Sequence, residues 1–311
     1  MKPTGHLFLS LVFVFLIING ANAQNQSGKD STGLPGDNFS LQGALEMFQK
    51  AGSPEEFEKL INTPDNHINN LDLNGDGDID YIRVIDNSKD NAHAFVLQDV
   101  VSDKESQDVA VIELEKTGDT TATLQIVGDE DLYGEQIIAE PNASNDDRAY
   151  MEEEPSALAM RGPNAVYQFQ NPGIFVNVWF WPCVRFVYVP TYVVWRSPWR
   201  WHYYPMWWRP WRPFAWYMWH PFHYGYERRF AIVTEHRVMV AHRIYTPLRV
   251  TSVTVHTRNQ VVLNNYRVTR TRTTVTGPRG NQYQRTTTTV QNHRRRTTTK
   301  STRVRERKRR R

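Results

Sequence analysis

Residues 72–80 carry oxygen-bearing side chains at a spacing that suits one hard divalent cation. Aspartate or asparagine occupies the first, third, fifth and ninth positions, and Gly77 occupies the sixth. Ca²⁺ prefers carboxylate, amide and carbonyl oxygens, and glycine permits the sharp turn that such a loop needs. The predicted ligands are Asp72, Asn74, Asp76, Asp78 (through its backbone carbonyl) and Asp80. One structural Ca²⁺ is expected, and the alternative is a metal-free turn rich in Asp and Gly.

The charge of this loop favours the ion, because its four carboxylates would repel one another if no cation lay between them. The pattern D-x-N-x-D-G-x-x-D resembles the calcium loops of FG-GAP/VCBS repeats and is similar to those of dockerin, thrombospondin type 3 and EF-hand proteins. It departs from the EF-hand at the twelfth position, where Arg83 replaces the bidentate glutamate. The resemblance covers nine residues and implies a metal site without an activity.

Other residues with metal-binding or nucleophilic side chains lack a recognisable companion. Six histidines of the second half are candidates: His202, His220, His223, His236, His242 and His256. None forms a zinc motif with cysteine or carboxylate, so we interpret them as surface histidines. Cys183, which lies among aromatic residues, is predicted to be a buried small hydrophobe. The sequence contains no G-x-S-x-G, H-E-x-x-H or phosphate-binding loop. A hydrolase with an unrecognised site is therefore an alternative hypothesis.

A small α+β domain is predicted to position the loop. Ser40 and Ser53 each fit the N-cap of a short helix, and Pro54 fits the first position of the second one. Strands follow at residues 79–85, 93–101, 109–115 and 122–127, with a fifth candidate at 134–140. Short polar connectors favour an antiparallel meander, with one face packed on the two helices and the other in water.

The N-terminal sequence predicts that the protein is exported. Lys2, an apolar run at 7–18 and the sequence Ala21-Asn22-Ala23 fit a signal peptide that is cleaved after Ala23. A short membrane anchor is the alternative, although the run is short for a bilayer span. The mature protein is expected in the periplasm, on the cell surface or in the medium. Cys183 is the only cysteine, so the chain forms no internal disulfide.

Charge divides the chain into two halves. Residues 24–160 contain 30 acidic and 8 basic residues, whereas residues 161–311 contain 3 acidic and 28 basic ones. From Arg267 onward there are 16 Lys/Arg and 13 Thr but no Leu, Ile, Phe or Trp, a composition that predicts a disordered tail. Such a tail binds polyanions, here lipopolysaccharide phosphates, acidic glycans, teichoic-type polymers or extracellular DNA, without specific nucleic-acid recognition. The alternative is contact with the acidic half of its own chain or of a neighbour.

All ten tryptophans lie between Trp179 and Trp219, among arginines and prolines. Three interpretations stay open: a buried β-hairpin, an interfacial membrane patch and a glycan-binding surface. Partial burial fits best, because a monomer rarely exposes so large an aromatic patch, and a face that contacts the envelope comes next. The predicted contact residues are Trp199, Arg200, Trp201, Trp207, Trp208, Arg209, Trp211 and Arg212, together with Arg294, Arg295, Arg296, Arg309, Arg310 and Arg311 of the tail.

The complete predicted organisation, in chain order, combines these parts. It comprises a signal peptide (1–23), a flexible lead-in (24–38), the acidic α+β domain (39–141), a linker (142–165), a Trp/Pro/Arg-rich β or extended region (166–266) and the disordered basic tail (267–311). Within the fifth part, residues 184–189 and 251–255 are strand-prone, and 229–245 fits helix or strand.

This layout resembles a family of exported bacterial envelope proteins, a resemblance that implies no particular activity. The first hypothesis is a non-enzymatic envelope or surface protein that uses its aromatic and basic half to contact an anionic polymer or membrane. An electrostatically self-assembling matrix protein is a further alternative, beside the hydrolase.

Overall fold

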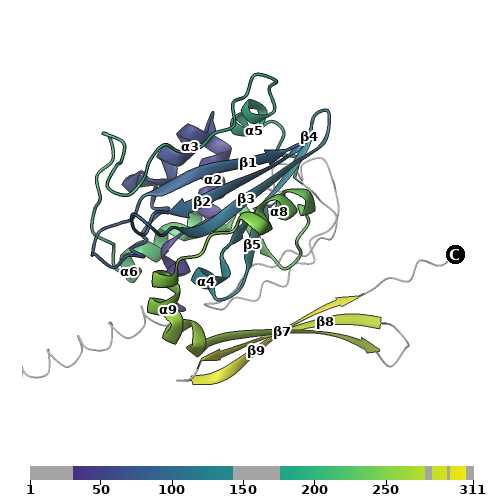
Figure 1. Ribbon diagram of the computed structural model, residues 1–311. Helices are drawn as coiled ribbons and strands as arrows, with labels where there is room; N and C mark the ends of the chain where they lie inside the picture. Colours follow the sequence, from purple (N-terminus) through teal and green to yellow (C-terminus); the bar gives the residue numbers. More distant parts are fainter. Residues whose placement is uncertain (1–30, 143–175, 277–281, 293–294, 306–311) are drawn as a thin grey trace, which may run out of the picture.

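A six-stranded antiparallel sheet, with strand order β1-β2-β3-β4-β5-β6, forms the centre of the molecule (Figure 1). This is a computed structural model, and it describes residues 31–142, 176–276, 282–292 and 295–305. The strands are β1 (Ile82–Lys89), β2 (Ala92–Asp99), β3 (Gln107–Gly118), β4 (Thr121–Gly128), β5 (Ile137–Pro141) and β6 (Phe230–Val233). The chain is therefore an α+β protein, as predicted, and its first five strands form the predicted meander.

The first strand begins later than predicted, at Ile82 instead of residue 79. The backbone N–H groups just before this strand form hydrogen bonds outside the sheet. The Ile79 N–H donates to the Trp211 carbonyl at 2.7 Å, and the Asp80 N–H donates to the Leu71 carbonyl at 2.9 Å. The first bond ties the 72–80 loop to the aromatic segment, and the second closes the loop onto the residue that precedes it.

Two helices pack on one face of the sheet, as predicted: α2 (Leu41–Lys50) and α3 (Pro54–Ile61). The Ser40 hydroxyl accepts the Gly43 N–H at 3.0 Å, and the Ser53 hydroxyl accepts the Glu56 N–H at 3.2 Å, so both predicted caps are confirmed. The Phe48 ring packs edge-on against Phe57, with the ring centroids 5.2 Å apart, and lies equally close to Phe95 of β2. The aromatic contacts join both helices to the sheet.

The opposite face of the sheet is covered as well, so the prediction that it meets water is wrong. Every residue of β2 is buried. Helix α8 (Met239–Tyr245) lies across this face in Figure 1 and contacts β2 and β3. The cover comes from a part of the chain more than one hundred residues downstream. A second apolar cluster fills the interface and contains Ala94, Val96, Val111, Val127, Ile138 and Tyr245.

The aromatic segment joins this fold and does not form a separate unit. The predicted strand at 184–189 is wrong, because α5 (Pro182–Val187) occupies most of it with proline at the first helical turn. Val178, Cys183 and Val184 belong to the same apolar core as α2 and α3. Further along lie α6 (Trp216–Trp219), η4 (His220–His223) and α7 (Tyr224–Glu227), and β6 then adds the sixth strand to the sheet.

The chain preceding α2 is also ordered where the structure describes it. The Ser31 and Thr32 hydroxyls donate to Asp37 at 2.8 and 2.7 Å, and Leu34 is buried, so the predicted flexibility of the lead-in does not hold for 31–38. The short elements around the core are η1 (Pro35–Asn38), η2 (Pro64–Asn66), α4 (Glu130–Tyr133) and η5 (Thr246–Leu248).

The last part of the described chain contains a helix and a second sheet. Helix α9 (Val253–Asn265) replaces the predicted strand at 251–255, because the Ser252 hydroxyl accepts the Val255 N–H at 3.2 Å and caps the helix. The strands β7 (Tyr266–Thr276), β8 (Gln282–Asn292) and β9 (Arg295–Arg305) form an antiparallel sheet. These residues belong to the tail that was predicted to be disordered, and threonine, which is frequent here, is one of the residues enriched in strands.

Three of the predictions concern residues outside the described ranges: the signal peptide and its cleavage site within 1–30, nearly all of the linker, and the end of the tail. Among the helices that the structure describes, none has both the length and the apolar character that crossing a bilayer requires.

Candidate functional site

The 72–80 loop turns back on its own backbone. The Asp72 carboxylate accepts the N–H groups of Gly75 at 2.6 Å, Asp76 at 3.1 Å and Gly77 at 3.0 Å. Gly77 has a φ of 90°, and a Cβ at this position would meet nothing within 4 Å. Backbone strain, rather than crowding, therefore selects glycine here, and the predicted sharp turn is confirmed.

Asn74 brings two of the predicted ligands together. Its Nδ2 donates to Asp76 Oδ2 and to Asp80 Oδ1, each at 3.0 Å, while its Oδ1 accepts the Asp76 N–H at 2.8 Å. Asp78 is exposed, and its N–H donates to Asp76 Oδ1 at 2.9 Å. The side chains of Asn74, Asp76 and Asp80 thus meet, and an amide nitrogen rather than an oxygen bridges the two carboxylates. Among the described residues, no three carboxylates of the loop lie within 4.8 Å of one another, so the predicted ligands are not arranged around a common point. The residue types remain oxygen donors of the kind that Ca²⁺ prefers.

Asp99, at the end of β2, adds a carboxylate that was not predicted at this loop. The side chain is fully buried, and no N–H or hydroxyl donor reaches its oxygens among the described residues. Burial and the adjacent Asp80 charge raise the pKa of Asp99 well above its ordinary value. Burial also raises the pKa of Asp80 to about 7, although the Leu73 N–H opposes that shift. Two adjoining buried carboxyls need a shared proton or a cation.

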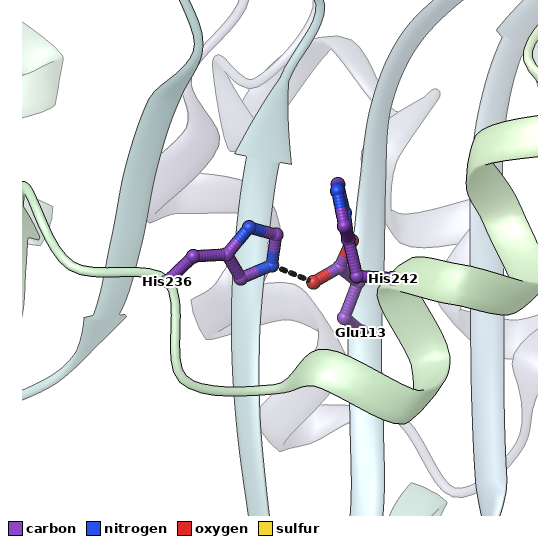
Figure 2. A group of neighbouring side chains, drawn as sticks. All are labelled: Glu113, His236 and His242. Carbon is purple, nitrogen blue, oxygen red and sulfur yellow. Dashed lines mark hydrogen bonds and ion pairs between the residues drawn. The ribbon is translucent and has the colours of Figure 1, made fainter.

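A second group of ligand-type side chains lies on the opposite face of the sheet, where Glu113 of β3 meets two histidines (Figure 2). Glu113 Oε1 lies 2.8 Å from His242 Nδ1, and its Oε2 contacts His236 Nε2. One ligand atom from each residue lies within 4.8 Å of the other two, and no similar group with three His, Cys, Asp or Glu ligands occurs in the described ranges. The hydrogen bond in which the Glu113 carboxylate is the acceptor raises the pKa of His242, against the effect of burial.

This geometry corrects the interpretation of His236 and His242 as ordinary surface histidines, because both share a fully buried carboxylate. Glu113 lies in the predicted strand at 109–115, where its alternation with apolar residues favours the face predicted to meet water, and for that reason it was not among the predicted ligands. Two similar tetrapeptides, Glu235-His236-Arg237-Val238 and Ala241-His242-Arg243-Ile244, were the available signal. They place two imidazoles six residues apart on the segment that crosses the sheet.

The predicted aromatic and basic contact residues differ in exposure. Arg200, Arg209 and Arg212 are exposed, and Trp207 is 46% exposed. Trp208 is buried, with its ring 5.1 Å from that of Tyr81, so it is removed from the predicted contact surface. Three further indoles are half-buried: Trp199, Trp201 and Trp211. In the tail, Arg295 and Arg296 begin β9, whereas Arg294, Arg309, Arg310 and Arg311 lie outside the described residues.

A cavity of about 430 Å³ lies beside the exposed part of the aromatic segment. Trp199 and Trp207 form one wall, and residues of α3 with Tyr81 form the other. The Lys59 ammonium lies 5.7 Å from the centre of the Trp207 ring, so a cation already stacks on this indole.

Comparison with known proteins finds no match: no protein-family model, no curated protein and no solved structure is significantly similar to this chain.

Proposed function

We propose that the protein is an exported, non-enzymatic envelope protein that attaches to an anionic envelope surface through residues 193–212. The supporting observation is that large apolar side chains in this segment are exposed next to arginines. Met206 is 92% exposed and Val193 is 84% exposed. Tryptophan, tyrosine and arginine with exposed apolar neighbours suit the boundary between water and an anionic lipid surface.

The arginines of this surface are held beside the apolar residues. Arg209 Nη1 donates to the carbonyls of Met206 at 3.2 Å and Trp208 at 2.7 Å. The Arg200 guanidinium lies 5.3 Å from the centre of the Tyr203 ring. Positive charge and apolar area therefore face outward together. An anionic headgroup and the acyl region below it are the matching chemistry.

Hydrogen bonds hold this segment against the sheet, so less conformational entropy is lost when it binds a partner. The Ser197 N–H donates to the Val84 carbonyl at 3.1 Å, and Arg83 Nη1 donates to the Trp199 carbonyl at 3.4 Å. Buried Glu58 also accepts the Ser197 hydroxyl at 2.8 Å. These bonds fix the backbone immediately before the exposed residues, so the surface exists before a partner arrives.

In this proposal the 72–80 loop binds Ca²⁺ through Asp72, Asn74, Asp76, Asp78 and Asp80. The ion would supply the positive charge that the crowded carboxylates lack. The loop touches the proposed contact segment directly, because the Ile79 N–H donates to the Trp211 carbonyl at 2.7 Å. Calcium would therefore stabilise the end of that segment as well as the start of the sheet.

The test is co-sedimentation of the mature chain, residues 24–311, with vesicles of phosphatidylcholine alone or mixed with phosphatidylglycerol. The triple variant M206S/W207S/R209Q removes one charge and two apolar side chains. Its binding to the anionic vesicles should fall by roughly 10–100-fold, since each basic residue near such a surface contributes about 1 kcal/mol and apolar burial adds to it. The control variant R228Q/Y224S changes exposed residues of the same kinds outside the segment and should bind normally.

Two further measurements test the role of the basic tail and the role of the lipid surface separately. Removal of residues 267–311 measures the contribution of the basic tail, which the proposal expects to be large. A soluble polyphosphate in competition distinguishes attraction to phosphate alone from attachment to a lipid surface. A wild-type chain that stays in the supernatant, or a triple variant that sediments as wild type does, would refute the proposal.

A further inference from the structure

We propose that Glu113, His236 and His242 bind one divalent transition-metal ion of the zinc class. The two facing imidazole nitrogens and the carboxylate oxygens belong to a single small cluster, with one atom of each residue within 4.8 Å of the others. Two histidines and one carboxylate form a ligand set that leaves coordination positions open for water or another group. This site is separate from the calcium-type loop in both position and donor chemistry.

The backbone that carries His236 is fixed independently of Glu113. Gln125 of β4 points at this backbone and bonds it with both ends of its amide. Its Oε1 accepts the Arg237 N–H at 2.8 Å and the Val238 N–H at 3.3 Å, and its Nε2 donates to the Glu235 carbonyl at 3.0 Å. His236 therefore contacts Glu113 from a loop whose backbone is held in place by Gln125.

His242 is positioned by a different anchor. It lies on α8, and Glu115 Oε1 accepts N–H groups at the start of this helix, including that of Ala241 at 3.0 Å. Glu113 and Glu115 are two residues apart on β3, so they point to the same face of the sheet. One strand thus supplies both the proposed ligand and the cap that orients the second histidine.

Glu113 itself has an unusual position for a carboxylate. It is fully buried, on the face that also carries the apolar cluster around Val96 and Val111. In the sheet register it lies opposite Ala94 on one side and Gln125 on the other. A buried carboxylate needs compensation, which a doubly charged cation supplies more completely than two hydrogen bonds do.

The geometry needs only a small adjustment to accept an ion. Ligand atoms around zinc lie about 2.0–2.2 Å from the metal, which places them roughly 3.4 Å from one another in a tetrahedral site. The side chains of His236 and His242 are 16% and 23% exposed, so water and an ion reach the cluster from that side. Bound metal needs a lone pair on each facing nitrogen, and acid should therefore release it.

The experiment titrates the mature chain, freed of metal by a chelator, with Co²⁺ and follows the visible absorption of the bound ion. A competition with a chromophoric chelator then gives the affinity for Zn²⁺. Glu113→Gln, His236→Gln and His242→Gln should each weaken binding by more than about 100-fold, because losing a ligand exceeds the usual effect of losing a supporting residue. Unfolding curves without metal establish that each variant is folded.

Two matched variants locate the ion. His256→Gln changes an exposed histidine outside the cluster, and Asp76→Asn changes the calcium-type loop; both should bind one Co²⁺ as the wild type does. If the wild type shows no saturable Co²⁺ absorption, the cluster is a proton-sharing group only, and the proposal fails. Binding that Asp76→Asn abolishes while the folded His236→Gln variant retains it would also overturn the assignment.

Discussion

The buried carboxyl pair beside the 72–80 loop predicts how stability depends on pH when no divalent cation is present. In the folded chain the pKa of Asp80 is raised from 3.8 to about 7. The folded state therefore holds this proton more tightly than the unfolded state does. The contribution to stability is fully present below the unfolded pKa and is lost as the pH rises through about 7.

The expected magnitude follows from the same shift. Each pH unit between the two pKa values changes the free energy of unfolding by about 1.36 kcal/mol, so the interval from pH 5.5 to about 7 corresponds to about 2 kcal/mol. Asp80→Asn removes the carboxyl group whose pKa burial raises. The variant should lose most of this pH dependence, because the amide binds no proton over this range.

Urea unfolding of the mature chain in a chelator, at about pH 5.5 and pH 8, measures both quantities. Burial also raises the pKa of Asp108, to about 6, but this group is present in wild type and variant alike and cancels in their difference. The control is Asp103→Asn, which removes an exposed carboxylate that follows β2. An unchanged pH dependence in Asp80→Asn would refute the argument that this buried carboxyl holds its proton in the folded state.

The same unfolding measurement with added Ca²⁺ tests the calcium proposal independently. If the loop binds Ca²⁺ with a dissociation constant of about 10⁻⁴ M, 10 mM Ca²⁺ should stabilise the wild type by about 2.7 kcal/mol at pH 8. The gain should shrink at about pH 5.5, where protons already occupy the carboxyl pair. Asp76→Ala should abolish the gain. Stability that does not respond to Ca²⁺ at either pH would dismiss the calcium proposal while leaving the proton argument intact.

Three further predictions concern the core. Glu58→Gln should destabilise the fold by about 2 kcal/mol in urea unfolding, because an amide in place of Oε2 opposes the Val84 N–H that now donates to it at 2.8 Å. Phe48→Ala should lower the free energy of unfolding by about 3–5 kcal/mol, measured the same way, since this buried ring joins α2 to α3 and the sheet. Cys183 is buried and its pKa is raised by burial, so a thiol reagent should modify it only at the rate of unfolding, in contrast to a fast reaction in urea.

Local patterns predicted the parts of the fold that depend on neighbouring residues. The serine caps, the alternating strands and the turn at Gly77 each follow from a few consecutive side chains, and the structure has them all. Even so, local preference failed at 251–255. The β-branched residues from Val253 onward begin a helix because Ser252 caps it and is itself held by Glu105 and Gln107, more than one hundred residues earlier.

The Glu113 cluster lay beyond such patterns for the same reason. Glu113 alternates with apolar residues along β3, which is the usual pattern of a strand with one face in water. Its partners are 123 and 129 residues away in the chain, on a segment that fits helix or strand equally well. The pairing of β6 with β5 returns the chain to the sheet just before that segment. Without knowledge of this topology, the local sequence around a buried glutamate cannot be distinguished from that around an exposed one.

The contacts also show how the acidic and basic halves of the chain interact. Arg249 bonds Asp129 at 2.6 Å and Asp131 at 3.0 Å, Arg229 bonds Glu46 at 2.9 Å, and all three acids belong to the acidic half. Part of the opposite charge is therefore paired within one chain.

A self-assembling matrix would need the same charges to pair between chains, and exchanging one set of partly buried pairs for another gains little free energy. Arg200 and Arg209 differ, because among the described residues they contact only their own segment and both are exposed. Their charge remains available to an anionic surface. The observations therefore favour attachment through this segment over self-assembly by the two halves.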